Sequence, residues 1–149
     1  MTNPRIPPLT PPYPAETGAW LAKWMPPGAP VEPLVLFRAL ATHPEFTDRM
    51  RPLGSGILGR ASTIEPRERE LVIARTCARC GCEYEWGVHM AFFAERVGLD
   101  ADQISSLTHG SPYDPCWTAP GEVALLQAGD ELHDTSQVGD ACWIALCSH

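Results

Sequence analysis

Three side chains that could act together in proton transfer follow Gly81: the thiol of Cys82, the carboxylate of Glu85 and the imidazole of His89. If a helix begins after Gly81, a rotation of about 100° per residue places all three within roughly 60° of arc on one face. Cys82 then lies in the first turn, where exposed backbone N–H groups and the helix dipole favour a thiolate. The pattern therefore predicts a site of proton-transfer chemistry.

His89 is suited to this chemistry because the unperturbed pKa of an imidazole, about 6.5, lies near neutral pH. Glu85 precedes it by one helical turn and could orient its ring. The alternative is an ordinary contact between residues i and i+4, which stabilises a helix by only about 0.3 kcal/mol. The spacing by itself leaves both interpretations open.

Three of the six cysteines, Cys77, Cys80 and Cys82, lie within six residues. This clustering favours reduced or redox-active thiols over a secreted disulfide scaffold. Cys77 and Cys80 form a Cys-x2-Cys pair that could close a disulfide at a helix end, or Cys77 could simply pack in the core. No metal site is predicted, because three thiols and His89 on two stiff helical segments hardly reach a tetrahedral arrangement. We interpret the remaining cysteines as structural: Cys116, Cys142 and Cys147.

The helices that must carry these residues are predicted on either side of Gly81. A start signal over residues 63–66 opens a helix that runs to about Arg79, and a second helix runs from about Cys82 to Val97 and stops at Gly98. Helical spacing of apolar residues predicts further helices, and no segment has the alternation of a strand, so the chain is predicted to be all-α. These further helices are expected over residues 16–24, 32–41, 45–58 with interruptions at Pro52, Gly54 and Gly56, 100–107, 117–132 and 137–147.

The chain has 149 residues, of which 44% are hydrophobic and 19% charged, so we expect a folded protein with a single core. Six prolines among the first 14 residues predict a non-helical arm over 1–15, either disordered or laid across a neighbouring subunit. One helical domain is expected over 16–149. A net charge of −7 without a basic cluster argues against a nucleic-acid partner. The longest apolar run, residues 141–147, is too short to span a membrane, so we expect a cytoplasmic protein.

The spacing Glu70-x11-Cys82-x2-Glu85-x3-His89 resembles a known pattern. It is similar to the Glu-x11-Cys-x2-Cys-x3-His redox pattern of the carboxymuconolactone decarboxylase and alkylhydroperoxidase D-like family. The segments PRERE at 66–70, Tyr-Glu-Trp at 84–86 and DELH at 130–133 resemble one branch of this family. The resemblance covers about residues 65–146.

The resemblance implies an alkylhydroperoxidase D-like helical bundle that works without a cofactor and assembles into trimers or hexamers. By position, Glu70 corresponds to the carboxylate that assists the histidine, Cys82 to the first thiol and His89 to the proton relay. The implied cleft lies near the start of the second helix of the motif, at a subunit interface. Three more residues are candidates for its lining: Tyr84, Trp86 and His133.

Two features depart from the family pattern. Glu85 occupies the place of the second cysteine, so the two-cysteine peroxidase cycle cannot be copied directly. The chain also stops at His149, inside what corresponds to the last helical hairpin of this branch. We therefore expect a bundle shortened at its C-terminus, with an uncovered apolar face that favours assembly.

Three functions follow as expectations. The leading one is reduction of hydroperoxides through Cys82, with His89 and Glu70 managing protons. The rival is cofactor-independent proton transfer on a small lactone or enol acid by Glu70, Glu85 and His89, as on the decarboxylase side of the family. The third is a non-catalytic oligomeric domain that binds a small apolar ligand or only assembles.

Overall fold

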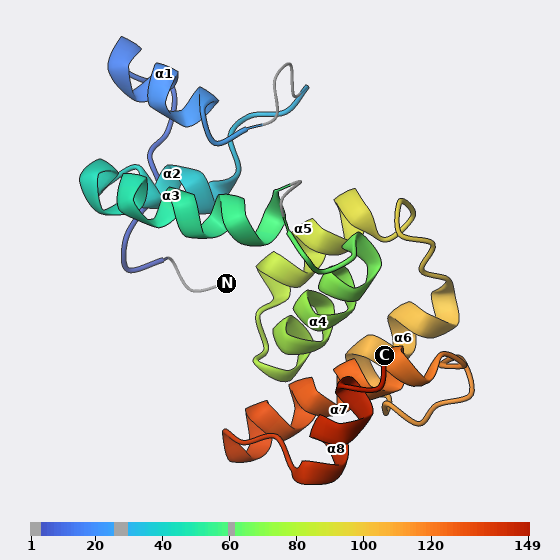
Figure 1. Ribbon diagram of the computed structural model, residues 1–149. Helices are drawn as coiled ribbons and strands as arrows, with labels where there is room; N and C mark the ends of the chain where they lie inside the picture. The colour runs from blue at the N-terminus through green and yellow to red at the C-terminus, as the bar shows by residue number, and fades with distance from the viewer. Residues whose placement is uncertain (1–3, 26–29, 60–61) are drawn as a thin grey trace. The chain divides into compact units, whose positions relative to one another are not determined.

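The computed structural model describes residues 4–25, 30–59 and 62–149. All regular secondary structure in these ranges is helical, which confirms the predicted all-α class (Figure 1). None of the helices in the described ranges is both long enough and apolar enough to cross a bilayer. The helices are α1 (Ala15–Ala22), α2 (Val35–Leu40), α3 (Pro44–Leu58), α4 (Pro66–Arg79), α5 (Glu83–Phe93), α6 (Ala101–His109), α7 (Pro120–Thr135) and α8 (Asp140–Leu146).

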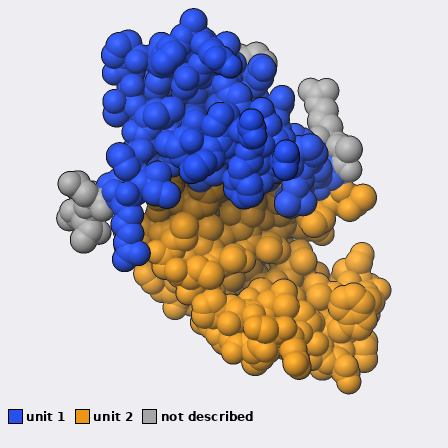
Figure 2. Space-filling model, turned by 90° about the vertical axis from the view of Figure 1, so that its left-hand side faces the viewer, with its two compact units in different colours: residues 1–62 blue, residues 63–149 orange. Residues whose placement is uncertain are grey.

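The chain divides into two compact units, residues 1–62 and 63–149 (Figure 2). Helices α1–α3 belong to the first unit and α4–α8 to the second. This division falls between Ser62 and Thr63, and the arm predicted over 1–15 is part of the first unit.

In the first unit, aromatic side chains connect the first two helices. The ring centroids of Trp20 and Trp24 lie 5.4 Å apart, and the same distance separates Trp24 from Phe37 of α2. The indole N–H of Trp20 also donates to Asp48 Oδ1 of α3 at 2.9 Å. Leu21 of α1 is fully buried. Trp20 and Trp24, which are four residues apart, are thus a packing element of this unit.

The described part of the Pro-rich arm, from Pro4 onward, is bonded to the first unit itself. The backbone N–H of Leu9 donates to the carbonyl of Arg38 at 3.2 Å, and the Arg38 guanidinium donates back to the carbonyl of Leu9 at 3.1 Å. Reciprocal bonds of this kind satisfy backbone groups that the neighbouring prolines leave without partners. The arm therefore has a place on its own chain, an arrangement that neither of the two sequence alternatives included.

Helix α3 differs from the sequence prediction because it runs without a break through Pro52, Gly54 and Gly56. A proline inside a helix removes one backbone hydrogen bond, and each glycine costs about 1 kcal/mol relative to alanine. These costs weaken a helix without ending it. The prediction of interruptions at these positions was therefore wrong.

Helix α5 ends at Phe93, four residues earlier than predicted, and the chain then turns at Gly98. Gly98 has φ +67°, a conformation that glycine adopts without steric cost. The N–H of Leu99 donates to the carbonyl of Ala94 at 2.9 Å across this turn. The helix was therefore predicted to end too late: Gly98 closes the turn that follows α5 and does not end the helix itself.

The second unit is built around α4, which contacts α5, α6 and α7, while α8 packs against α7 (Figure 1). Apolar residues from four segments of the chain meet at α4 and form the core. Trp86, Met90 and Val97 pack against this core from the α5 side. The core cluster consists of Leu71, Ala74, Ala94, Leu99, Leu107, Trp117 and Leu126.

Arg75, only 5% exposed, connects α4 to two other helices. Its Nε and Nη2 atoms each bond an oxygen of Asp130 on α7 at 2.7 Å, which is a two-pronged ion pair. Its Nη1 atom donates to three carbonyls at the end of α6, those of Ser106, Leu107 and Gly110, at 3.0–3.3 Å. A buried guanidinium whose three nitrogen atoms all donate hydrogen bonds holds these helix ends in register.

We expect Arg75→Lys to lower the free energy of unfolding by about 3 kcal/mol, because an ammonium group keeps the charge but cannot make the fork or reach the three carbonyls. Urea denaturation followed by circular dichroism measures this change. Arg96→Lys is the matched control, since Arg96 is exposed and lies over the Phe93 ring, and should cost less than about 1 kcal/mol. Equal losses in the two variants would contradict this role of Arg75.

Candidate functional site

The turn between α4 and α5 positions the candidate site. Gly81 has φ +65°, and across it the N–H of Cys82 donates to the carbonyl of Cys77 at 2.8 Å, while the N–H of Gly81 donates to that of Ala78 at 3.2 Å. These two bonds define a Schellman motif, the turn that glycine commonly builds at a helix end. The break predicted at Gly81 therefore stops α4 and sends α5 back along it.

The center of the site is a buried hydrogen bond between these two helices. Oε2 of Glu70 on α4 lies 2.6 Å from Nδ1 of His89 on α5. Glu70 is 1% exposed and His89 is 8% exposed. The other oxygen of Glu70 receives a longer bond from Nε of Arg69 at 3.4 Å. The carboxylate predicted to assist the histidine is thus in direct contact with it.

The pKa of His89 is raised above its usual value of 6.5. The hydrogen bond to Glu70 is the main cause, and the negative charges of Glu70 and Glu85 add to it, while burial acts in the opposite direction. Because Glu70 occupies Nδ1, Nε2 is the ring nitrogen that can exchange a proton with other groups. His89 is therefore an imidazole prepared to hold a proton close to neutral pH and to exchange it through Nε2.

Glu85 lies on the Nε2 side of His89. Its Oε1 atom is 3.6 Å from Nε2, an ion-pair contact that is longer than a hydrogen bond, and its side chain is one-third exposed. The imidazole is therefore placed between two carboxylates, one buried on Nδ1 and one partly exposed on Nε2. This arrangement connects a buried acid/base pair to the protein surface.

Cys82 lies one residue before α5, at its N-cap position, and is exposed, whereas Cys77 on α4 is buried. The pKa of Cys77 is raised to about 11, mainly by burial and then by the nearby side chains of Cys82, Glu85 and Cys80. Cys80 is exposed at the end of α4. Among the described residues, no three His, Cys, Asp or Glu side chains are grouped so as to hold a metal ion.

The three candidate cleft residues have different surroundings. Tyr84 is 45% exposed on the first turn of α5, and Trp86 packs against the core with a buried indole N–H that has no hydrogen-bond partner among the described residues. His133 lies at the end of α7, where its Nδ1 is 2.7 Å from Asp134 and 3.4 Å from Nη2 of Arg79. The structure thus places His133 in a surface ion-pair group on α4 and α7.

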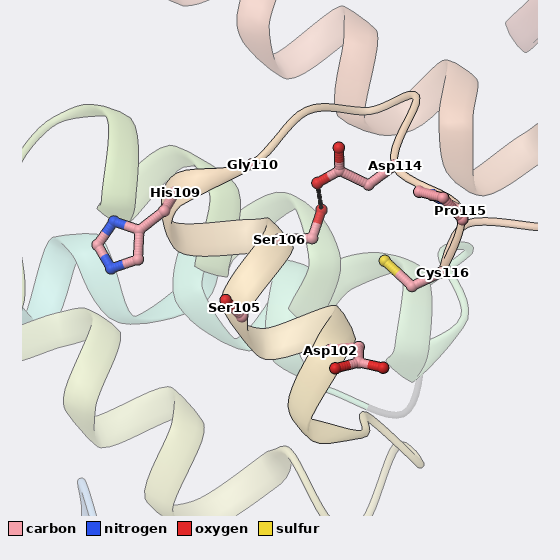
Figure 3. A pocket seen from close by; sticks show the side chains of 8 residues that line it. All are labelled: Asp102, Ser105, Ser106, His109, Gly110, Asp114, Pro115 and Cys116. Atoms are coloured by element: carbon pink, nitrogen blue, oxygen red, sulfur yellow. Dashed lines mark hydrogen bonds between the residues drawn. The ribbon is translucent and has the colours of Figure 1, made fainter.

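A hollow of about 470 Å³ beside α6 was not expected from the sequence (Figure 3). Ser106 and Asp114 face each other there, and Ser106 Oγ donates to Asp114 at 2.7 Å and accepts from the Trp117 indole at 2.8 Å. The backbone N–H of Ser111, then the Ser106 hydroxyl, lower the pKa of Asp114. These bonds hold the loop after α6 in place. No motif in the sequence predicts them. The lining comprises Asp102, Ser105, Ser106, His109, Gly110, Asp114, Pro115 and Cys116.

Comparison with known families gives one match. The model of the carboxymuconolactone decarboxylase family matches residues 44–129, a segment that includes Glu70, Cys82, Glu85 and His89. No curated protein and no solved structure matches the chain. The family match covers more than half of the chain and agrees with the resemblance seen in the motif.

The contact between Glu70 and His89 predicts a pH-dependent stability. Because the folded state binds the His89 proton more tightly than the unfolded chain, the stabilisation is complete below about pH 6.5 and is lost as the pH rises through the raised pKa. Glu70→Gln should lower the pKa of His89, as read from the imidazole proton signals in NMR. It should also cost about 2 kcal/mol of unfolding free energy at pH 5.5 and less at pH 8.5.

Glu83→Gln is the control for this experiment, because Glu83 is exposed on the same helix and its removal takes away one charge without touching His89. It should leave the titration of His89 almost unchanged. An equal shift of the His89 titration in both variants would show that net charge, and not the Glu70 contact, sets this pKa.

Proposed function

The chain belongs to the carboxymuconolactone decarboxylase family, and from this premise we propose that it is a thiol-dependent enzyme that reduces hydroperoxides at Cys82. The observation that carries the proposal is the buried Glu70–His89 pair, held on the same two helices as the exposed Cys82 thiol. One group is prepared to hold a proton and the other is accessible to a substrate. Both are needed to cleave an O–O bond with a thiol.

The order of residues along α5 supports this division of roles. Glu85 and His89 are one turn apart on the same face of α5, and Cys82 lies three residues before Glu85 at the N-cap of this helix. Glu85 stands between the other two and contacts His89 Nε2 at 3.6 Å. In this proposal the Glu85 carboxylate is the group that carries protons between the surface near Cys82 and the buried imidazole.

In the proposed first step, the Cys82 thiolate attacks the terminal oxygen of a hydroperoxide. An S–O bond forms as the O–O bond breaks, which leaves a sulfenic acid on Cys82 and an alkoxide. The alkoxide takes a proton supplied by the His89 imidazolium through Glu85 and leaves as an alcohol. Glu70 stabilises the imidazolium before the transfer and keeps Nδ1 engaged throughout.

A second candidate function is acid/base catalysis on a small lactone or enol acid without any thiol. The position of Glu85 favours it, because the imidazole then lies between two carboxylates and could act as a proton acceptor or donor at Nε2. In that case Glu85 would contact the substrate and Cys82 would be dispensable.

Cys82→Ser separates these two functions. If the thiol reacts with peroxide, the variant should lose hydrogen peroxide and organic hydroperoxide consumption by about two orders of magnitude or more, because serine is not oxidised in this way. His89→Gln should lower the same rate about a hundredfold through loss of the proton donor. Peroxide consumption in the presence of a dithiol reductant is the measurement.

Cys147→Ser is the matched control, since Cys147 is also an exposed thiol but lies beyond α8. It should keep the full rate. Hydrolysis or decarboxylation of a small lactone that survives Cys82→Ser but not His89→Gln would establish the acid/base function instead. Neutral effects of both variants in both assays would favour a non-catalytic assembling domain.

We also propose that the protein is a homo-oligomer, as the family resemblance implies. A row of apolar side chains on α3 supports assembly: Phe46, Met50, Leu53 and Ile57 recur at helical spacing and are between 40% and 67% exposed. On α8, Trp143 and Ile144 are also more than half exposed. Exposed apolar rows of this kind usually mark an interaction surface.

Leu53→Glu tests this assembly. Because Leu53 is 67% exposed, the charge should change the unfolding free energy by less than about 0.5 kcal/mol while it weakens contacts between copies. Light scattering after size-exclusion chromatography should show a lower mass for the variant than for the unmodified protein. Ser55→Glu, which adds the same charge on the opposite face of α3, should keep the original mass; a loss of mass with Ser55→Glu alone would place the interface elsewhere.

A further inference from the structure

We propose that Cys77 and Cys82 form a reversible dithiol/disulfide couple, in which Cys77 resolves the sulfenic acid formed on Cys82. This inference rests on the proposed function and supplies the partner thiol that the family pattern places at residue 85. The sequence pointed to Cys77 and Cys80 as the redox pair. The turn at Gly81 brings a different pair together.

The Schellman motif around Gly81 makes Cys77 and Cys82 neighbours. In this motif the residue after the glycine bonds back to the residue five positions earlier, and the side chains of these two residues commonly touch. Here the bond runs from the N–H of Cys82 to the carbonyl of Cys77 at 2.8 Å. The two positions that the motif brings into contact are therefore both cysteines.

The same bond satisfies the distance requirement of a disulfide. With standard bond lengths, an N···O separation of 2.8 Å keeps the Cα atoms of Cys77 and Cys82 within about 6.7 Å of each other. Disulfides span Cα distances of about 4.4 to 6.8 Å. The side chains also interact, because Cys82 is among the groups whose proximity raises the pKa of Cys77.

The surroundings of the two thiols assign their roles. Cys82 is exposed at the start of α5, so a hydroperoxide can reach it, whereas Cys77 is 9% exposed and its thiol is shielded from direct attack. Cys80 is exposed at the end of α4, and its backbone N–H donates to the carbonyl of Thr76, so no backbone bond joins it to Cys77. Cys82 is therefore the attacking thiol and Cys77 the resolving one.

The resolving step balances without a further oxidant. The Cys77 sulfur attacks the sulfur of the Cys82 sulfenic acid, an S–S bond forms, and the S–O bond breaks to release hydroxide. The proton of the Cys77 thiol ends on this hydroxide, so the product is water. Glu85, whose charge already acts on Cys77, is the nearby carboxylate that can carry this proton. A dithiol reductant then returns both residues to thiols by exchange and is itself oxidised to a disulfide.

Peptide mapping tests the pair sharply because Arg79 separates the two cysteines. Trypsin cleaves after Arg75, Arg79 and Arg96, so Cys77 lies alone in peptide 76–79, and Cys80 and Cys82 lie in peptide 80–96. The other three cysteines are in the last peptide, 97–149. The full chain is treated with one equivalent of hydrogen peroxide, blocked with an alkylating agent and digested without reduction.

We expect peptides 76–79 and 80–96 to be joined in the unmodified protein and in Cys80→Ser, and to be separate in Cys82→Ser and Cys77→Ala. Cys77→Ala should accumulate dimedone-reactive sulfenic acid on Cys82 and lose about tenfold or more in peroxide turnover with dithiothreitol. Circular dichroism checks that this buried replacement folds. The joined peptides in Cys80→Ser support the pair even if Cys77→Ala does not fold.

Two results would overturn the couple. One is dimedone-labelled Cys82 in the unmodified protein without joined peptides, which would leave peroxide reduction standing but remove Cys77 from it. The other is loss of the joined peptides in Cys80→Ser, which would assign the disulfide to Cys77 and Cys80.

Oxidation with diamide separates failure of the couple from failure of the proposed function, because diamide forms disulfides without a sulfenic acid. Suppose that diamide joins the two peptides but peroxide does not, in the unmodified protein and in Cys80→Ser alike. This result would support the Cys77–Cys82 couple and overturn peroxide reduction. Peptides that remain separate under both oxidants would overturn the couple.

Discussion

Helix α4 carries two charged side chains into the interior of the second unit, and the arrangement of its neighbours follows from pairing them. Removing an ion from water costs several kcal/mol, so a buried Glu70 and a buried Arg75 each require a bonded partner. Their positions differ by five residues, which turns them toward different sides of the helix. Glu70 meets α5 through His89, whereas Arg75 meets α7 through Asp130 and the end of α6 through backbone carbonyls.

The two pairs have different consequences. Arg75 and Asp130 form a two-pronged ion pair, so this contact serves stability and the register of the helices. The partner of Glu70 is an imidazole, which gains or loses its charge near neutral pH. The buried Glu70 carboxylate needs a paired partner, and on the side of α5 this partner is His89. His89 can therefore exchange protons while it remains in place.

Local signals in the sequence predicted the parts of this structure that depend on neighbouring residues. Pro66 and Gly81 mark the ends of α4 because a first-turn proline and a left-handed glycine act within one turn of the chain. The partners of Arg75 could not be predicted, since they lie 31 to 55 residues away and no spacing rule connects them. The pairing of Glu70 with His89 was anticipated only through the family pattern. Helical spacing suggested Cys80 as a possible partner of Cys77, and that rule does not consider the residues beyond the end of the helix.

Glu85 illustrates how a site can keep its geometry while one of its residues changes. At this position a thiol could contact Cys82 through the first turn of α5, and a carboxylate contacts His89 on the next turn instead. A carboxylate cannot form a disulfide, but it can accept and pass on a proton. A resolving thiol with a pKa of about 11 requires such a group, because it holds its proton tightly at neutral pH. With a carboxylate at residue 85, an internal disulfide can form only if another cysteine adjoins Cys82. The turn at Gly81 places Cys77 in that position.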